Sequence, residues 1–197
     1  HSQSIDGYFA HTPGLKVVYP SNASDAKGLL KYACRCDDPV LFMEHKGIYR
    51  QGFASSLEPD ENYLLPFGKA KVVQEGNDLT IVTWGAIVQK AVEASRNSGK
   101  SVEVIDIRTL NPLDIDTILD SIKKTNRVIV AHEDHLTSGF GSEIAAQISD
   151  VGFEYLDAPV KRVASKDVHV AYSPNLENEI LVQTSWIEQE IKEILTY

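Results

Sequence analysis

The residues best suited to chemistry stand at the start of the chain, where His1 precedes Ser2 and Gln3. An imidazole titrates at about pH 6.5, so a histidine donates or accepts a proton at neutral pH without a large change in its pKa. Ser2 and Gln3 carry polar groups that can hold the ring of His1 in one orientation by hydrogen bonds. His11 follows as a secondary candidate. Taken alone, a histidine at this position is more typical of a solvated terminus or a tag remnant, so a role for His1 in proton transfer depends on the sequence that follows it.

A second candidate site lies where a predicted helix ends, in residues 33–39. The last carbonyl oxygens of a helix lack intrahelical partners and carry partial negative charge, so they can bind a cation. A plain capped helix end is an equally good interpretation of the same residues. The two cysteines, Cys34 and Cys36, have too few partners for a structural zinc site and poor geometry for a mutual disulfide, which indicates two reduced thiols.

The run of residues 132–135, His-Glu-Asp-His, looks like a metal cluster but has the wrong spacing for one. A zinc-binding H-E-x-x-H helix needs its second histidine one residue later. The Gly139-Phe140-Gly141 turn that follows lacks the third glycine of a dinucleotide fingerprint, because position 144 is isoleucine. A tight turn that lets a helix pack on a sheet explains these glycines better.

Composition narrows the class of protein. The chain has 197 residues, of which 43% are hydrophobic, and a formal net charge of −9. No apolar run reaches the ~20 residues that cross a bilayer, and the beginning lacks the pattern of a secretory signal. The negative charge disfavours nucleic acid, whose phosphates need clustered lysine and arginine. We therefore expect a soluble protein, cytoplasmic or alternatively in the mitochondrial matrix, with neither a nucleic-acid nor a membrane partner.

Short β-branched runs alternate with helix-length amphipathic stretches, which predicts an α/β fold with a mostly parallel sheet. A segment without periodicity, residues 46–66, indicates a linker, and we place a domain boundary near Asn62. The predicted strands span residues 15–19, 40–43, 71–74, 79–83, 101–106, 127–131 and 160–163. The predicted helices span residues 25–36, 86–97, 113–124, 142–151 and 184–195. The turn at residues 75–78 suggests that its two flanking strands form a hairpin.

Several motifs occur in an order that resembles one enzyme family. H-S-Q at the start is followed by P-G-L-K-V-V at residues 13–18 and by D-A-K-G-L-L at residues 25–30. The sequence resembles the beta subunit, or the beta-like C-terminal part of a fused chain, of the thiamine-diphosphate-dependent 2-oxo acid dehydrogenases. The resemblance implies that residues 1–62 are the C-terminal part of a pyrimidine-binding domain plus linker. Residues 63–197 would then form a transketolase C-terminal-like domain.

The resemblance also implies a reaction, the oxidative decarboxylation of a 2-oxo acid with acyl transfer to a lipoyl group. His1 would lie beside the thiazolium ring, where it orients the substrate carboxylate or protonates the dithiolane. Ser2, Gln3 and His11 would support it. The motif E-H-K-G-x-Y-R-Q at residues 44–51 favours a branched-chain 2-oxo acid over pyruvate as the substrate. Transketolase and deoxyxylulose-phosphate synthase fit the H-S-Q start and residues 108–114 less well.

The cofactors implied are thiamine diphosphate and Mg, with sites mostly outside this chain. The glutamate that activates the aminopyrimidine and the G-D-G motif that holds Mg are both absent, so the chain by itself is expected to be inactive. The family also binds potassium through main-chain carbonyls near a helix end. This implicates Ala33, Cys36 and Asp38.

The partners implied are the alpha-type part of the enzyme, a second copy as a dimer, and the dihydrolipoyl acyltransferase with its lipoyl domain. Acidic side chains near the C-terminus would suit a small basic docking domain of the acyltransferase; they are Glu177, Glu179, Glu188, Glu190 and Glu193. The alternative from another class is a non-catalytic module for dimerisation and partner docking.

Overall fold

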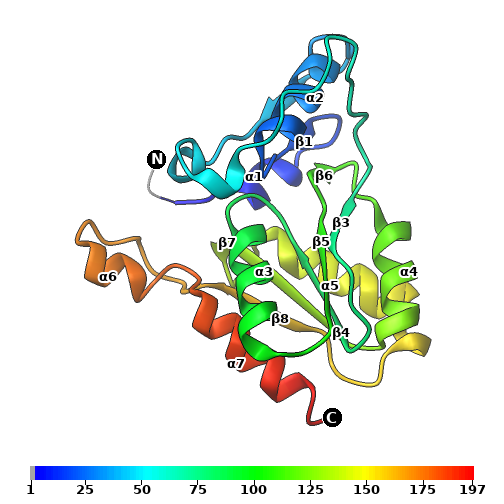
Figure 1. Cartoon of the computed structure of the whole chain (residues 1–197), viewed down its shortest axis with the longest axis vertical. Coiled ribbons are helices and arrows are strands. Elements are labelled where there is room, and N and C mark those ends of the chain that lie inside the picture. Colours follow the sequence, from blue (N-terminus) through cyan, green and yellow to red (C-terminus); the bar gives the residue numbers. More distant parts are fainter. Residues whose placement is uncertain (1–2) are drawn as a thin grey trace.

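The computed structural model describes residues 3–197, and it contains two sheets (Figure 1). The larger sheet has five strands in the order β3-β5-β4-β7-β8, and the smaller has three in the order β2-β1-β6. The strands are β1 Lys16–Val18, β2 Val40–Phe42, β3 Lys71–Gln74, β4 Leu79–Thr83, β5 Val102–Asp106, β6 Thr109–Asn111, β7 Val128–His135 and β8 Lys161–Ser165.

Helices cover both faces of the larger sheet (Figure 1). The helices are α1 Asp6–Ala10, α2 Ala23–Ala33, α3 Ile87–Ser98, α4 Ile115–Thr125, α5 Phe140–Val151, α6 Pro174–Asn178 and α7 Thr184–Ile194, with short 3-10 turns at Lys46–Ile48, Gly52–Ala54 and Phe153–Tyr155. Helix α6 stands away from the body of the molecule. Among the described residues, no helix is long and apolar enough to cross a membrane.

The core follows from the alternation of side chains along the central strands. In β4, Ile81 belongs to a buried cluster with α3 and α7, and its neighbour Val82 belongs to the cluster on the opposite face, with α4 and α5. Successive side chains of a strand point to opposite faces, so a strand buried on both sides is mostly apolar along its whole length. Strands β5, β4, β7 and β8 are parallel neighbours, which confirms the predicted α/β class.

The predicted hairpin is wrong. β3 pairs antiparallel with β5, and β5 lies between β3 and β4. The amides of Asn77 and Asp78 both donate to the carbonyl of Ser101, at 2.9 and 2.7 Å, so the turn crosses the beginning of β5. A Cβ on Gly76 would lie 2.1 Å from the carbonyl carbon of Val102. The glycine therefore serves a close crossing of backbones, a role that a hairpin turn does not require.

Strand β6 was not predicted, and it joins the two halves of the chain. It follows β5 directly, yet it pairs antiparallel with β1 in the smaller sheet. The amide of Tyr19 donates to the carbonyl of Arg108 at 2.8 Å, which extends this pairing. The two parts of the chain therefore share a sheet.

Candidate functional site

Polar side chains gather at one edge of the larger sheet, where it meets the N-terminal unit, residues 3–66. Trp84 follows β4, Asp106 ends β5, and Asp134 lies near the end of β7. The carboxyl ends of parallel strands meet at the same edge, which is where ligands bind in many α/β proteins. Here the N-terminal unit covers that edge. We call this contact region the seam.

The first group at the seam is built around Asp6, at the beginning of α1. Its side chain is fully buried, and its carboxylate accepts a hydrogen bond from Trp84 Nε1 at 2.5 Å and one from Ser4 Oγ at 3.2 Å. Asp134 lies beside it and accepts from the amide of Gly7 at 3.1 Å. Burial, and then repulsion from Asp134, raises the pKa of Asp6 to about 7.

The second group is a buried ion pair. Arg108 donates from Nε and Nη2 to the two carboxylate oxygens of Asp25, both at 2.8 Å. Beside this pair, Asp106 accepts from Ser21 Oγ at 2.5 Å and from the amide of Arg108 at 2.9 Å. Burial raises the pKa of Asp106 to about 6. Arg108 adopts a left-handed φ of 60°, which indicates that these contacts hold its backbone in place.

The third group links the loop after β2 to β7. His45 Nε2 lies 3.1 and 3.0 Å from the two carboxylate oxygens of Glu133. This hydrogen bond raises the pKa of His45 above its usual value. Glu133 also lies near Lys90 of α3, whose ammonium donates to the carbonyl of Val182 at 2.5 Å. The group joins three elements by charged contacts.

Residues 132–135 do not gather at one site: Glu133 pairs with His45, Asp134 lies 3.6 Å from Nδ1 of His135, and His132 packs elsewhere. His132 stacks on Trp84, with ring centroids 5.3 Å apart, and burial lowers its pKa to about 4. A Cβ on Gly141 would lie 2.2 Å from the ring of His132, so the glycine turn is needed for close packing. Within residues 3–197, no group of three or more metal-ligating side chains comes together.

The predicted catalytic residue His1 and its neighbour Ser2 lie outside the described residues. Gln3 is half-buried, and its Oε1 lies 3.2 Å from Nδ1 of His169 in the loop before α6. His11 is exposed after α1 and lines a crevice of about 690 Å³ with Asn111 and Glu143. The structure thus shows a contact between Gln3 and His169 that the sequence did not indicate. The role of His11 stays a prediction.

The predicted cation site lies in the turn after α2, which ends at Ala33, three residues before its predicted end. The carbonyl of Ala33 already accepts the amide of Cys36 at 3.1 Å. The carboxylate of Asp38 lies 3.6 Å from the ammonium of Lys16. The carboxylate is therefore balanced by a lysine, and a potassium ion would depend on free lone pairs of main-chain carbonyls.

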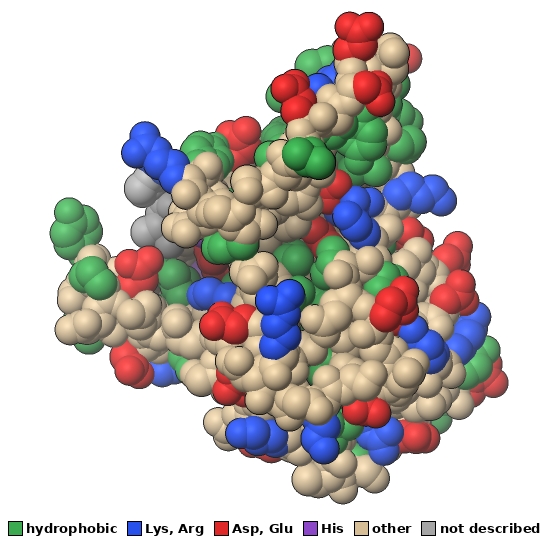
Figure 2. Space-filling view, viewed as in Figure 1, with side chains coloured by type: hydrophobic (Ala, Val, Ile, Leu, Met, Phe, Trp, Pro, Cys, Tyr) green, Lys and Arg blue, Asp and Glu red, His purple; other side chains and the backbone are tan. Residues whose placement is uncertain are grey.

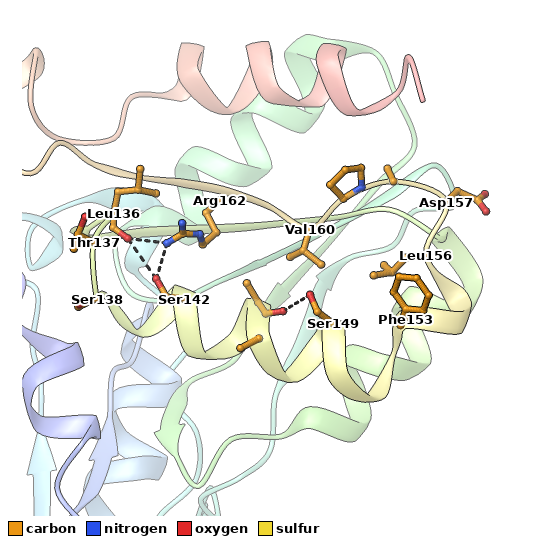
Figure 3. Close-up of a pocket in the computed structure, with 14 residues that line it drawn as sticks. Leu136, Thr137, Ser138, Ser142, Ser149, Phe153, Leu156, Asp157, Val160 and Arg162 are labelled. Atoms are coloured by element: carbon orange, nitrogen blue, oxygen red, sulfur yellow. Dashed lines mark hydrogen bonds between the residues drawn. The ribbon is translucent and has the colours of Figure 1, made fainter.

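A larger groove, of about 1020 Å³, lies between α5 and the chain before β8, away from the seam (Figure 3). At one end Arg162 donates to the carbonyl of Leu136 at 2.7 Å and to Ser142 Oγ at 2.5 Å. Phe153 and Leu156 line the other end. The groove combines an apolar end with a polar end that Arg162 organises.

Sequence reasoning missed the residues that form the seam, which are Asp6, Asp25, Trp84, Asp106 and Arg108. Each contact joins residues far apart in the chain, such as Asp6 with Trp84 or Asp25 with Arg108. A signal existed for Asp106, a carboxylate that closes an apolar strand. The structure shows that these groups fasten the N-terminal unit to the C-terminal unit.

Comparison with protein families gives two matches. Residues 68–187 match the family described as transketolase, C-terminal domain, and residues 1–51 match the one described as transketolase, pyrimidine binding domain. Together the two matches account for both the N-terminal unit and the larger sheet.

Curated relatives match nearly the whole chain. It is 44% identical, over 98% of its length, to the mitochondrial pyruvate dehydrogenase E1 component subunit beta of Dictyostelium discoideum. It is 42% identical, over 100% of its length, to the 2-oxoisovalerate dehydrogenase subunit beta of Bacillus subtilis. The chain spans 56% of the length of the first and 61% of the second.

Solved structures show the same fold at lower identity. A split gene transketolase, described as an inactive beta4 tetramer, superposes with a TM-score of 0.77 at 23% identity, over 97% of this chain and 60% of that one. Transketolase from Leishmania mexicana superposes with a TM-score of 0.62 at 18% identity, over 96% and 26%.

Proposed function

The chain belongs to the transketolase C-terminal domain family, and from this premise we propose that it is the beta-type part of a thiamine-diphosphate-dependent 2-oxo acid dehydrogenase. The observation that carries the proposal is the identity of 44% and 42% to two beta subunits across nearly the whole chain. The transketolases compared with it are only 23% and 18% identical, so they support the fold alone.

We propose a division of labour between the two parts of the chain. Residues 1–62 form the C-terminal part of a pyrimidine-binding domain plus linker, and residues 63–197 form the transketolase C-terminal-like domain. His1 orients the carboxylate of the 2-oxo acid or donates a proton to the dithiolane of a lipoyl group, with Ser2, Gln3 and His11 in support. Thiamine diphosphate supplies the electron sink for decarboxylation. Its contacts and those of Mg are expected mainly from residues outside this chain.

The substrate proposal is a branched-chain 2-oxo acid before pyruvate. The relatives include proteins named for each of these substrates, so the choice rests on residues 44–51. We expect the full-length protein, combined with its alpha-type partner, thiamine diphosphate and Mg, to decarboxylate 3-methyl-2-oxobutanoate with a higher kcat/KM than pyruvate. Steady-state assays with the two acids on the same preparation would measure this. A higher kcat/KM for pyruvate would reverse the substrate assignment and leave the enzyme class intact.

We further propose that potassium binds the turn at Ala33, Cys36 and Asp38 through main-chain oxygens, and that the protein works as a dimer with its alpha-type partner. The setting would be the cytoplasm or the mitochondrial matrix, because the relatives include a bacterial and a mitochondrial protein.

The acyltransferase is proposed to dock on the C-terminal unit, but the acidic residues there are partly paired. Glu190 lies 3.4 Å from Lys161, and Glu188 accepts from Asn97 at 2.6 Å. Figure 2 shows acidic and basic side chains interspersed on the face that it presents. A surface of mixed charge attracts a basic domain less strongly than a purely acidic surface does. We therefore propose that the docking domain contacts Glu177 and Glu193 in addition to Glu188 and Glu190.

Docking by this surface predicts a dependence on salt and on charge. Raising the salt shortens the Debye length, which is about 8 Å at physiological salt, and should slow association of a basic docking domain. Glu177→Lys with Glu193→Lys should slow it further at low salt. Surface-plasmon measurements with the acyltransferase's docking domain would give the rates, and Asp150→Lys on α5 serves as a control. Association rates that change neither with salt nor with the double charge reversal would exclude this surface as the docking site.

A further inference from the structure

Two carboxylates are buried side by side at the seam, and within residues 3–197 no lysine or arginine forms an ion pair with either of them. Asp6 is fully buried and Asp134 is 8% exposed, and the two are close neighbours, because the amide of Gly7, the residue after Asp6, donates to Asp134 at 3.1 Å. The groups that donate to them are neutral: Trp84 and Ser4 donate to Asp6, and the amides of Gly7 and His135 donate to Asp134. Two carboxylates that share a buried site do not both ionise readily, because each charge repels the other.

The other titratable groups around the pair do not replace a cation. Tyr19 faces Asp6 from the end of β1, and burial raises its pKa well above the usual range, so it is neutral. His132 is neutral because burial lowers its pKa to about 4. Glu133 is negative and paired with His45. His135, with Nδ1 at 3.6 Å from Asp134, is a partly exposed histidine at the rim of the group.

We propose that Asp6 and Asp134 share one proton, and that this proton fastens residues 3–10, directly after the H-S-Q motif, to the C-terminal unit. Asp6 begins α1, and the amide of the next residue, Gly7, donates to Asp134 at 3.1 Å. The pair therefore holds α1 from two adjacent positions. A Cβ on Gly7 would lie 2.9 Å from Asp134 Oδ2, so no larger side chain fits between α1 and this carboxylate.

The shared proton positions α1, and the effect of this positioning on activity rests on the proposed function. A shared proton fixes the approach of α1 to β7, and α1 fixes where the chain leaves the H-S-Q motif. Removing the proton leaves two like charges in contact, which pushes α1 away from β7. The segment before α1 is then no longer held close to β7.

The expected dependence of stability on pH follows from Asp6. Its pKa is about 7 in the folded protein, against an ordinary value of 3.8 for an aspartate. Between these values the folded protein holds a proton that the unfolded chain has lost, so stability falls as the pH rises through this window. One such proton changes the unfolding equilibrium constant by about tenfold per pH unit. Above about pH 7 this contribution is gone.

The test compares Asp6→Asn and Asp134→Asn with the wild type of the full-length protein. In either variant an amide donates to the remaining carboxylate, so the contact persists. Asp6→Asn removes the carboxyl whose pKa is raised, whereas in Asp134→Asn the repulsion is gone but burial still raises the pKa of Asp6. Chemical unfolding between pH 5 and pH 8 should show a dependence weaker by about one proton in Asp6→Asn and weaker by a smaller amount in Asp134→Asn, and both variants should be more stable than the wild type at pH 8. Asp116→Asn, an exposed aspartate on α4, should keep the wild-type dependence. Equal pH dependence in wild type and both variants would overturn the proposal.

A second readout does not require unfolding. The infrared difference spectrum between wild type and Asp6→Asn should contain the carbonyl band of a protonated carboxyl at pH 6, and this band should vanish by pH 8. The absence of that band at pH 6 would overturn the shared proton. In lipoyl acylation, wild-type activity should fall above about pH 7 more steeply than that of Asp6→Asn. If the protein acylates no lipoyl group but the band is present, the proposed function fails and the shared proton stands.

Discussion

His1→Ala is expected to lower the rate of lipoyl acylation by about 10²- to 10⁴-fold, the range for removal of a general acid or base. Decarboxylation should fall less, because a methyl group cannot pass a proton to the dithiolane but leaves room for the substrate. Single-turnover measurements on the assembled full-length enzyme would separate the two steps, with a lipoyl domain as one acceptor and an artificial oxidant as the other.

His1→Gln is the matched variant for this prediction. A glutamine keeps a polar side chain that can orient a carboxylate, but it transfers no proton. If His1 acts by proton transfer, both variants should be equally slow in acylation. If it only orients the substrate, His1→Gln should recover most of the rate. Full acylation by His1→Ala would contradict any chemical role for this residue.

Asp25→Ala should destabilise the protein by about 3–5 kcal/mol, the cost of leaving one partner of a buried ion pair uncompensated. The side chains of Arg108 and Asp25 are 9% and 1% exposed, and two hydrogen bonds of 2.8 Å join them. Without Asp25 the guanidinium of Arg108 stays buried with no carboxylate opposite its Nε and Nη2. Chemical unfolding of the variant and the wild type at pH 7 would measure the difference.

Asp120→Ala provides the comparison for the buried pair. Asp120 forms an ion pair with Lys123 on α4 at 2.9 Å, but the two side chains are 76% and 47% exposed. Solvent screens such a pair, so its loss should change the unfolding midpoint very little. If Asp25→Ala and Asp120→Ala had equally small effects, Asp25 and Arg108 would not fasten α2 to the C-terminal unit.

The elements whose signal is local could be predicted from the sequence. The helix predicted at residues 86–97 is α3, Ile87–Ser98, and the apolar strand predicted at residues 101–106 is β5, because each has its own periodicity or apolar run. The hairpin failed because the turn at residues 75–78 does not reveal that β5 comes to lie between the flanking strands. Strand β6 is only Thr109–Asn111, too short for an alternating pattern, and its partner β1 lies far back in the chain.

The same distinction between local signals and long-range contacts applies to the candidate site. The H-S-Q motif and the family could be recognised in consecutive residues, and the match of residues 68–187 and 1–51 to the two transketolase domains confirms the fold. The partner of Gln3, His169, lies 166 residues further along the chain. The bond between Asp6 and Trp84 spans 78 residues. Such pairs depend on how the two units pack, and no local pattern in a single sequence encodes that packing.

The most direct test of the proposed function is the mass of a lipoyl domain after incubation with a 2-oxo acid, thiamine diphosphate, Mg and the full-length protein together with its alpha-type partner. We expect the domain to gain one acyl group in the complete mixture. It should gain none when either protein part is left out, because we propose that the two parts share the cofactor contacts. An unmodified lipoyl domain in the complete mixture, with both parts shown to be folded and assembled, would contradict the assignment of this chain to a 2-oxo acid dehydrogenase.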